Sequence, residues 1–142
     1  MLKNINPILS PELLKILSEM GHGDEIVIAD ANFPSVNYGQ RVVRADGISG
    51  TQILDAVLSV FPLDTSSEQN FILMQLVPSD VGKVNPTIWE EYKVIASKHD
   101  DNTRLGDEER FAFYERAKKA FCVIATGEKA IYANIILKKG VI

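Results

Sequence analysis

Short, continuously apolar runs alternate along this chain with longer stretches in which apolar residues recur at helical spacing. The runs Ile26–Ala29, Phe71–Val77 and Cys122–Ala125 have the length and the side chains of buried strands. Strands that alternate with helices form a sheet covered by those helices. The 142 residues are therefore expected to form a single α/β domain, residues 1–142, with a mainly parallel or mixed central sheet flanked by helices.

Capping residues and prolines set the expected bounds of the helices. Ser10-Pro11 and Asn85-Pro86 are typical helix starts. Gly21 and Pro62 end the first two helical patterns. The patterns run from Pro11 to Met20, from Ser49 or Thr51 to Phe61, from Pro86 through Ile95, and from Asp107 to Phe121.

The remaining segments are expected to be loops and two further strands. Phe33–Gly39 and Lys98–Gly106 have the polar or turn-forming composition of loops. Arg41–Arg44 and Tyr132–Leu137 are predicted to be strands. Because only the short turn at Thr126-Gly127 precedes the final strand, the last two strands are predicted to form an antiparallel hairpin.

Composition limits the classes of partner. The chain is 46% hydrophobic and 24% charged, as in ordinary globular proteins, and carries a net charge of −4. A negative charge argues against nucleic acid or an anionic membrane surface as the main partner. The lone Cys122 is expected in the core, and a single cysteine suits the reducing cytoplasm. No stretch has the ~20 apolar residues of a membrane span or the apolar core of a signal peptide.

The densest polar chemistry surrounds the first strand. His22 lies between Gly21 and Gly23 before that strand, and Asp30 follows it directly. An imidazole that titrates near neutral pH is suited to general acid–base catalysis. The alternative is that His22 only forms hydrogen bonds with the end of the preceding helix, and the sequence leaves both interpretations open.

Other reaction classes lack their motifs. His22 and His99 do not share a helical ligand spacing, so no metal is expected, although His22, Asp24 and Asp30 resemble a ligand cluster. The glycines at 21 and 23 lie between a helix and a strand, the reverse of the order in a dinucleotide-binding turn, so no nucleotide cofactor is expected. No nucleophile elbow is present. General acid–base catalysis is the reaction class that these exclusions leave.

Two further pairs of side chains are candidates for a binding site, and the first of them suits a neutral polyol. Tyr132 and Asn134 alternate correctly to share one face of the last strand, where a phenol and an amide offer both donors and acceptors. Arg110 and Tyr114 lie four residues apart on one helix face. Exposed positions at a strand end and on a helix surface are the structural alternatives.

Five separated blocks together resemble the fucose mutarotase and ribose pyranase family. They are Gly21–Glu25, Asp30–Pro34, Arg44–Gly47, Arg110–Ala117 and Tyr132–Gly140. The resemblance implies a cofactor-free isomerase that opens and recloses the ring of a free sugar. It assigns the proton donor to His22 and sugar contacts to Asp30, Arg110, Tyr132 and Asn134.

The same resemblance implies further site residues and an assembly. The animal fucose branch adds Asp64 as a sugar contact and gives Tyr114 and Tyr132 catalytic roles. The family forms rings, so a homo-oligomer, decameric in many bacterial members, is expected. The blocks around His22 and Tyr114 are similar to the fucose branch, whereas Ala133 matches the ribose branch. L-fucose is therefore the expected sugar, with D-ribose or a non-catalytic sugar-binding module as alternatives.

Overall fold

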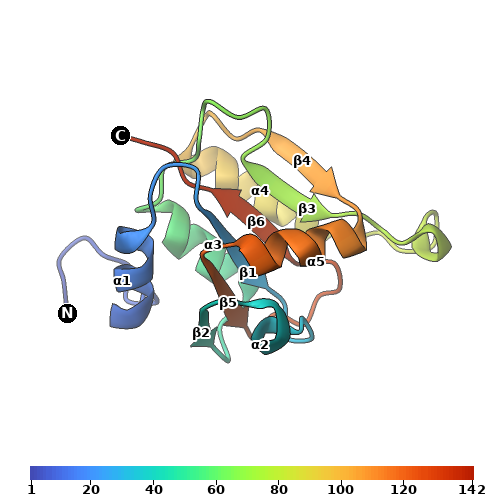
Figure 1. Cartoon of the computed structure of the whole chain (residues 1–142), viewed down its shortest axis with the longest axis horizontal. Helices are drawn as coiled ribbons and strands as arrows, with labels where there is room; N and C mark the ends of the chain where they lie inside the picture. The colour runs from blue at the N-terminus through green and yellow to red at the C-terminus, as the bar shows by residue number, and fades with distance from the viewer.

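The computed structural model describes residues 1–142 as helices packed on both faces of one sheet (Figure 1). The helices are α1 (Pro11–Glu19), α2 (Ser35–Tyr38), α3 (Gly50–Leu58), the 3-10 turn η1 (Pro78–Asp80), α4 (Ile88–His99) and α5 (Arg110–Lys119). The strands are β1 (Glu25–Ala29), β2 (Val42–Ala45), β3 (Phe71–Met74), β4 (Leu105–Glu108), β5 (Cys122–Thr126) and β6 (Ile135–Lys138).

The sheet is mixed, as predicted. Its strand order is β2-β5-β1-β6-β3-β4, and β1 pairs in parallel with β5. Only β6 runs antiparallel to its neighbours, β1 and β3. The fully buried β1 and β5 lie inside the sheet, because strands covered on both faces can carry continuous apolar runs.

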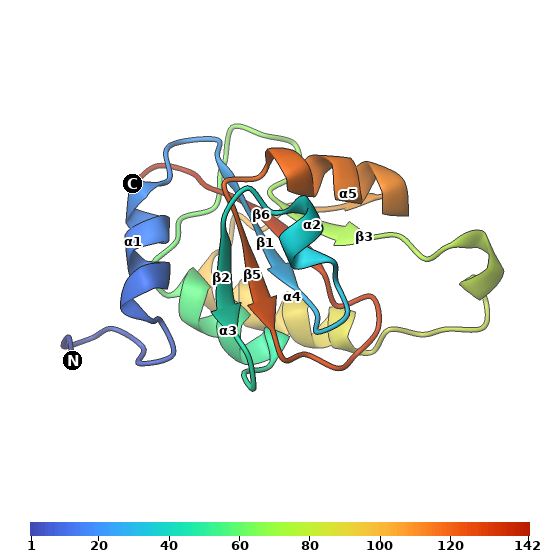
Figure 2. The same cartoon turned by 60° about the horizontal axis from the view of Figure 1, so that its bottom comes forward.

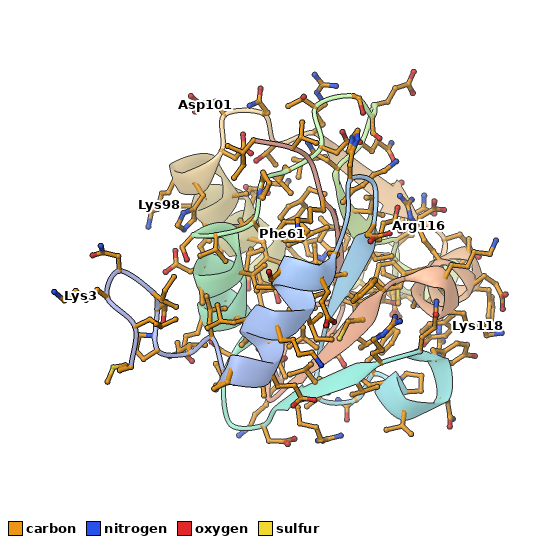
Figure 3. All side chains as sticks on the ribbon, turned by 60° about the vertical axis from the view of Figure 1, so that its left-hand side comes forward. Lys3, Phe61, Lys98, Asp101, Arg116 and Lys118 are labelled. Carbon is orange, nitrogen blue, oxygen red and sulfur yellow. The ribbon has the colours of Figure 1, made fainter.

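The core lies on both faces of the sheet. Helices α1, α3 and α4 pack on one face in the larger apolar cluster, whereas α5 and the segment around α2 cover the other face (Figure 2). Phe61 lies among the buried side chains of the larger cluster, while Lys98, Asp101 and Lys118 point outward (Figure 3). Cys122 is buried as expected, and burial raises the pKa of its thiol to about 11.

The starts of α1 and α3 follow the predicted capping chemistry. The Ser10 hydroxyl accepts the main-chain N–H of Leu13 at 3.1 Å, one residue before the proline that begins α1. Ser49 and Gln52 form a reciprocal capping box at the start of α3. The predicted cap at Asn85-Pro86 is wrong, because the N-cap of α4 is Thr87, whose side chain makes no capping hydrogen bond, and the helix begins at Ile88.

The predicted terminal hairpin is wrong, because β1 lies between β5 and β6. The chain after β5 crosses the end of β1 instead of turning back. The carbonyl of Glu128 accepts the N–H of Ala31 at 2.8 Å, and its carboxylate accepts the N–H of Gly50 at the start of α3. The backbone at Gly127 passes close to Gly47, because a Cβ on residue 127 would lie only 2.7 Å from the main-chain nitrogen of Gly47. These contacts direct the chain to the far side of β1.

Several predicted bounds also differ from the structure. The expected loop 98–106 ends in β4, an edge strand whose partly exposed residues lack an apolar signal, so Asp107 belongs to a strand and α5 begins at Arg110. The Glu109 carboxylate caps α5 by accepting the N–H groups of Phe111 and Ala112. The loop after Phe33 contains the single turn α2, β3 ends at Met74, and β6 begins only at Ile135.

Candidate functional site

A cavity of about 240 Å³ opens beyond the carboxyl ends of β1 and β3, beside the start of α5. Loops converge at such strand ends, which makes them common ligand sites in α/β proteins. The cavity brings together five of the seven predicted site residues: Asp30, Arg110, Tyr114, Tyr132 and Asn134. Its remaining walls are Asn32, Phe33, Met74, Val77 and Ile131.

Asp30 and Asn134 form a reciprocal pair on the floor of the cavity. The Asn134 amide donates to Asp30 Oδ2 at 3.0 Å, and its oxygen accepts the Asp30 N–H at 2.8 Å. Both side chains are buried. Burial raises the pKa of Asp30 above its ordinary value, although the N–H of Asn32 and the amide of Asn134 lower it. The pair therefore fixes hydrogen-bonding groups in a poorly solvated place.

An aromatic group forms the opposite wall. Tyr114 stacks on Tyr38 with ring centroids 5.0 Å apart, and the ring of Phe33 meets Tyr114 edge-on at 5.5 Å. Arg110 Nε donates to the Tyr114 hydroxyl at 3.2 Å, which leaves the rest of the exposed guanidinium free to bind. The cavity thus offers an apolar side and a polar side.

Tyr132 reaches the cavity from a loop rather than from a strand, so its predicted place in β6 is wrong. Its backbone has φ 58°, a left-handed conformation that is uncommon for residues other than glycine. The hydroxyl donates to Asp80 Oδ2 at 2.5 Å and accepts the N–H of Val77 at 3.2 Å. Burial and then the bond to Asp80 raise the pKa of the phenol.

The other two predicted site residues form a separate pair. His22 Nε2 lies 3.1 Å from Asp64 Oδ1, with 51% of the imidazole exposed and only 3% of the Asp64 side chain exposed. The Ser66 and Ser67 hydroxyls donate to the Asp64 carboxylate and hold its pKa well below its ordinary value. The carboxylate beside His22 is therefore that of Asp64 and not that of Asp30.

The turn that carries His22 is braced by Lys139. Its ammonium donates to the carbonyl oxygens of Leu17 and Met20 at the end of α1. The Lys139 main-chain carbonyl accepts the N–H of Gly23, and the Lys139 N–H donates to the carbonyl of Asp24. Within this turn Gly23 has a left-handed backbone, with φ 86°, whereas Gly21 does not.

The two groups lie at opposite ends of β1. His22 precedes this five-residue strand and Asp30 follows it. At about 3.3 Å per residue, the strand alone separates them by about 16 Å. Within one chain the cavity and His22 therefore do not meet, and His22, Asp24 and Asp30 do not gather as a ligand cluster. No group of three His, Cys, Asp or Glu side chains is arranged to hold a metal ion.

The sequence interpretation missed Asp80 and the hydrophobic lining residues Met74, Val77 and Ile131. Asp80 lies on η1 in an excursion between β3 and α4 that extends from the body of the molecule (Figure 2). Its only sequence signal is an acidic residue in a loop after a buried strand, which is common.

None of the helices combines the length and apolar composition needed to cross a bilayer.

Comparison with known proteins agrees with this geometry. Fucose mutarotase of Mus musculus is 54% identical over 143 residues, which cover 98% of this chain and 94% of the relative. The Streptococcus pneumoniae fucose mutarotase in complex with L-fucose has a TM-score of 0.93 and 45% identity over 99% of each chain. Bacillus subtilis RbsD complexed with D-ribose is more distant, with a TM-score of 0.75 and 25% identity over 100% of this chain and 99% of that one.

The agreement extends along almost the whole sequence. The family model described as the RbsD / FucU transport protein family matches residues 3–142. With this match and relatives that are half identical over the full fold, the chain belongs to the RbsD / FucU family.

Proposed function

We propose that this chain is a cofactor-independent mutarotase that interconverts the α and β anomers of free L-fucose. The observation that carries the proposal is a monosaccharide-sized cavity with an aromatic wall on one side and fixed polar groups on the other. The greater similarity to proteins named fucose mutarotase than to the ribose-bound relative favours L-fucose.

Mutarotation requires two proton transfers and no redox step. A base takes the proton of the anomeric hydroxyl while an acid protonates the ring oxygen, and rotation before reclosure gives the other anomer. We assign the acid–base groups to His22, Tyr114 and Tyr132. Positioned proton transfer contributes ~10²–10⁴-fold, a suitable scale for a reaction that already proceeds in water.

The remaining site residues would bind and orient. Asp30, Asn134 and Arg110 offer acceptors and donors for the sugar hydroxyls, and Asp64 would hold the His22 imidazole. The C5 methyl group of L-fucose needs an apolar contact, for which the ring of Phe33 is available. D-ribose has no such methyl group.

We further propose that a neighbouring copy supplies His22, and hence that the protein is a homo-oligomer. Exposed apolar side chains lie beside both groups. Ile131 lines the cavity and Phe111 packs against Tyr114, while Val60, Val141 and Ile142 line a cleft together with His22. This second cleft, of about 590 Å³, has apolar walls. Head-to-tail contact between two such surfaces closes a ring when the rotation permits.

Saturation-transfer NMR on the anomeric protons tests the function, because it measures exchange without net reaction. We expect the enzyme to accelerate exchange of L-fucose more than that of D-ribose at equal concentration. Faster exchange of D-ribose between pyranose and furanose forms would replace the assignment by a ribose pyranase, the reading that Ala133 favours. Binding of L-fucose without any acceleration would identify a sugar-binding module.

We further propose a cytoplasmic location, which is supported by the proposed substrate and by the buried thiol of Cys122, since a free thiol suits a reducing compartment. Cell fractionation with an antibody against the chain checks this location.

A further inference from the structure

The half-buried carboxylate of Asp80 has no part in the roles assigned so far, yet it makes a short contact with a proposed acid–base group. Its Oδ2 lies 2.5 Å from the Tyr132 hydroxyl oxygen. Hydrogen bonds from a hydroxyl to an ionised carboxylate are shorter and stronger than neutral ones. The phenol proton is therefore directed at Asp80 and away from the cavity.

The other contacts of this hydroxyl leave room for a single role toward substrate. A tyrosine hydroxyl has one hydrogen to donate and two lone pairs that accept. The hydrogen goes to Asp80, and one lone pair accepts the N–H of Val77 at 3.2 Å. A sugar hydroxyl that approaches Tyr132 can therefore only donate its own hydrogen to the remaining lone pair.

The position of Tyr132 is held by several independent contacts. Its carbonyl accepts the indole N–H of Trp89 at 2.8 Å, and the Tyr92 hydroxyl donates to the next carbonyl, that of Ala133, at 2.9 Å. Both partners belong to α4, which the core holds firmly. These bonds maintain the left-handed backbone of Tyr132, and such conformations concentrate at functional sites.

We propose that Asp80 is the terminal proton acceptor of a relay that passes through Tyr132 during ring opening. The anomeric hydroxyl gives its proton to the Tyr132 oxygen as the phenol gives its own proton to Asp80. The C1–O5 bond breaks while the C1 carbonyl forms, and O5 takes a proton from the acid supplied by His22 or Tyr114. Ring closure reverses each step, so protons and electrons balance. The proposal rests on the mutarotase function proposed above.

Asp80 acts through Tyr132 and is thus a positioning residue that also stores a proton. The elevated pKa of the phenol agrees with this arrangement, since Tyr132 stays neutral and gains basicity only when its own proton moves to the carboxylate. A Tyr132 that acted alone would need to lose its proton first.

The first test replaces Asp80 with Asn. An amide oxygen still accepts the Tyr132 hydrogen, so the cavity keeps its shape, but a neutral amide is a poor proton acceptor. We expect Asp80→Asn to lower kcat for L-fucose exchange by ~10²-fold with KM changed by less than about threefold. Asp101→Asn, a change at an outward-pointing carboxylate, is the matched control and should leave exchange unchanged (Figure 3).

Chemical rescue separates proton transfer from a structural role. Formate added to Asp80→Ala should restore part of the exchange, because it supplies the missing carboxylate, whereas chloride at the same ionic strength should not. In a Tyr132→Phe background, Asp80→Asn should cause no further loss, since the relay needs the phenol.

The outcomes distinguish this proposal from the function on which it rests. If the unmodified protein accelerates no sugar exchange, the mutarotase function fails. If it is active and Asp80→Asn keeps at least half of kcat, the relay is wrong. A rise in KM as the main effect, or a folded Asp80→Ala that formate does not rescue, would assign Asp80 a structural role and would also overturn the relay.

Discussion

A carboxylate buried as deeply as Asp64 costs free energy unless its oxygens accept hydrogen bonds. Here both oxygens accept: Ser66 donates through its hydroxyl and its N–H, and Ser67 donates through its hydroxyl. The side chain of Asn70 then donates to the Asp64 main-chain carbonyl. Asp64 therefore stays ionised and presents a fixed negative charge to His22.

Replacement of Asp64 by Asn tests this charge. We expect L-fucose exchange to fall on the order of 10²-fold, because the imidazole loses the anion that fixes its tautomer.

The same replacement should have a pH-dependent effect on stability, because the pKa of Asp64 is lower in the folded state than in the unfolded state. The contribution of the Asp64 carboxylate to the free energy of unfolding is complete above the unfolded pKa of about 4 and is lost as pH falls through the folded pKa. Urea unfolding should thus show a penalty of about 2 kcal/mol at pH 7. The penalty should shrink at pH 3, and an equal penalty at both pH values would contradict the assignment.

At the scale of elements, Arg116 ties α5 to two strands. It donates to both carboxylate oxygens of Glu25 on β1, at 2.8 and 2.7 Å, and to Glu108 at the end of β4 at 3.0 Å. Only 24% of its side chain is exposed. Figure 3 shows Arg116 and Lys118 on the same helix, with Lys118 pointing outward.

Arg116→Met should reduce the free energy of unfolding by about 3 kcal/mol, because it leaves two partly buried carboxylates without a counter-charge. Lys118→Met is the matched control. It removes only exposed interactions, an ion pair with Glu115 and a cation–π contact 5.2 Å from the centroid of the Tyr38 ring, and should change stability by about 1 kcal/mol or less. Urea denaturation followed by circular dichroism measures both, and equal effects would show that the Arg116 network contributes nothing special.

The sequence could predict the elements that depend on interactions between neighbouring residues, but not those that depend on contacts between distant segments of the chain. The buried strands β1 and β5 and the capped starts of α1 and α3 depend on local periodicity and side-chain hydrogen bonds, and they were predicted correctly. The exposed edge strand β4 is held by main-chain bonds to β3, which leave no apolar pattern in the sequence. The place of β6 depends on hydrogen bonds of Glu128 with Ala31, just after β1, and with Gly50 at the start of α3. Neither bond joins neighbouring residues.

The candidate site divides in the same way. The residue types around the cavity were predicted, in part through the family resemblance. The pairing of Asp30 with Asn134 joins residues 104 positions apart, and no local pattern reveals such a contact. Asp80 was missed because its significance comes from a contact 52 positions away, with Tyr132.

At the scale of the whole molecule, the separation of His22 from the cavity predicts that two variants with strongly reduced activity complement each other. His22→Ala lacks the proposed donor, and Tyr132→Phe lacks the proposed phenol. When the two are unfolded together and reassembled in equal amounts, about a quarter of the head-to-tail sites receive both native groups. L-fucose exchange should return to about that fraction of the native rate.

Each variant reassembled alone is the control and should keep its reduced rate of exchange. No recovery in the mixture, or an active monomer by light scattering, would show that His22 does not act from a neighbouring copy.

The strand order also has a consequence for biosynthesis. Strand β1 is made early, but its two partners in the sheet, β5 and β6, come from the last segment of the chain. Until synthesis has passed Lys138, β1, which is apolar from Ile26 to Ala29, lacks at least one of its two hydrogen-bonding partners, and such unpaired edges promote aggregation. The centre of the sheet therefore cannot assemble until the segment through Lys138 has emerged from the ribosome. Shielding of β1 until these two later strands emerge would favour correct folding of this chain.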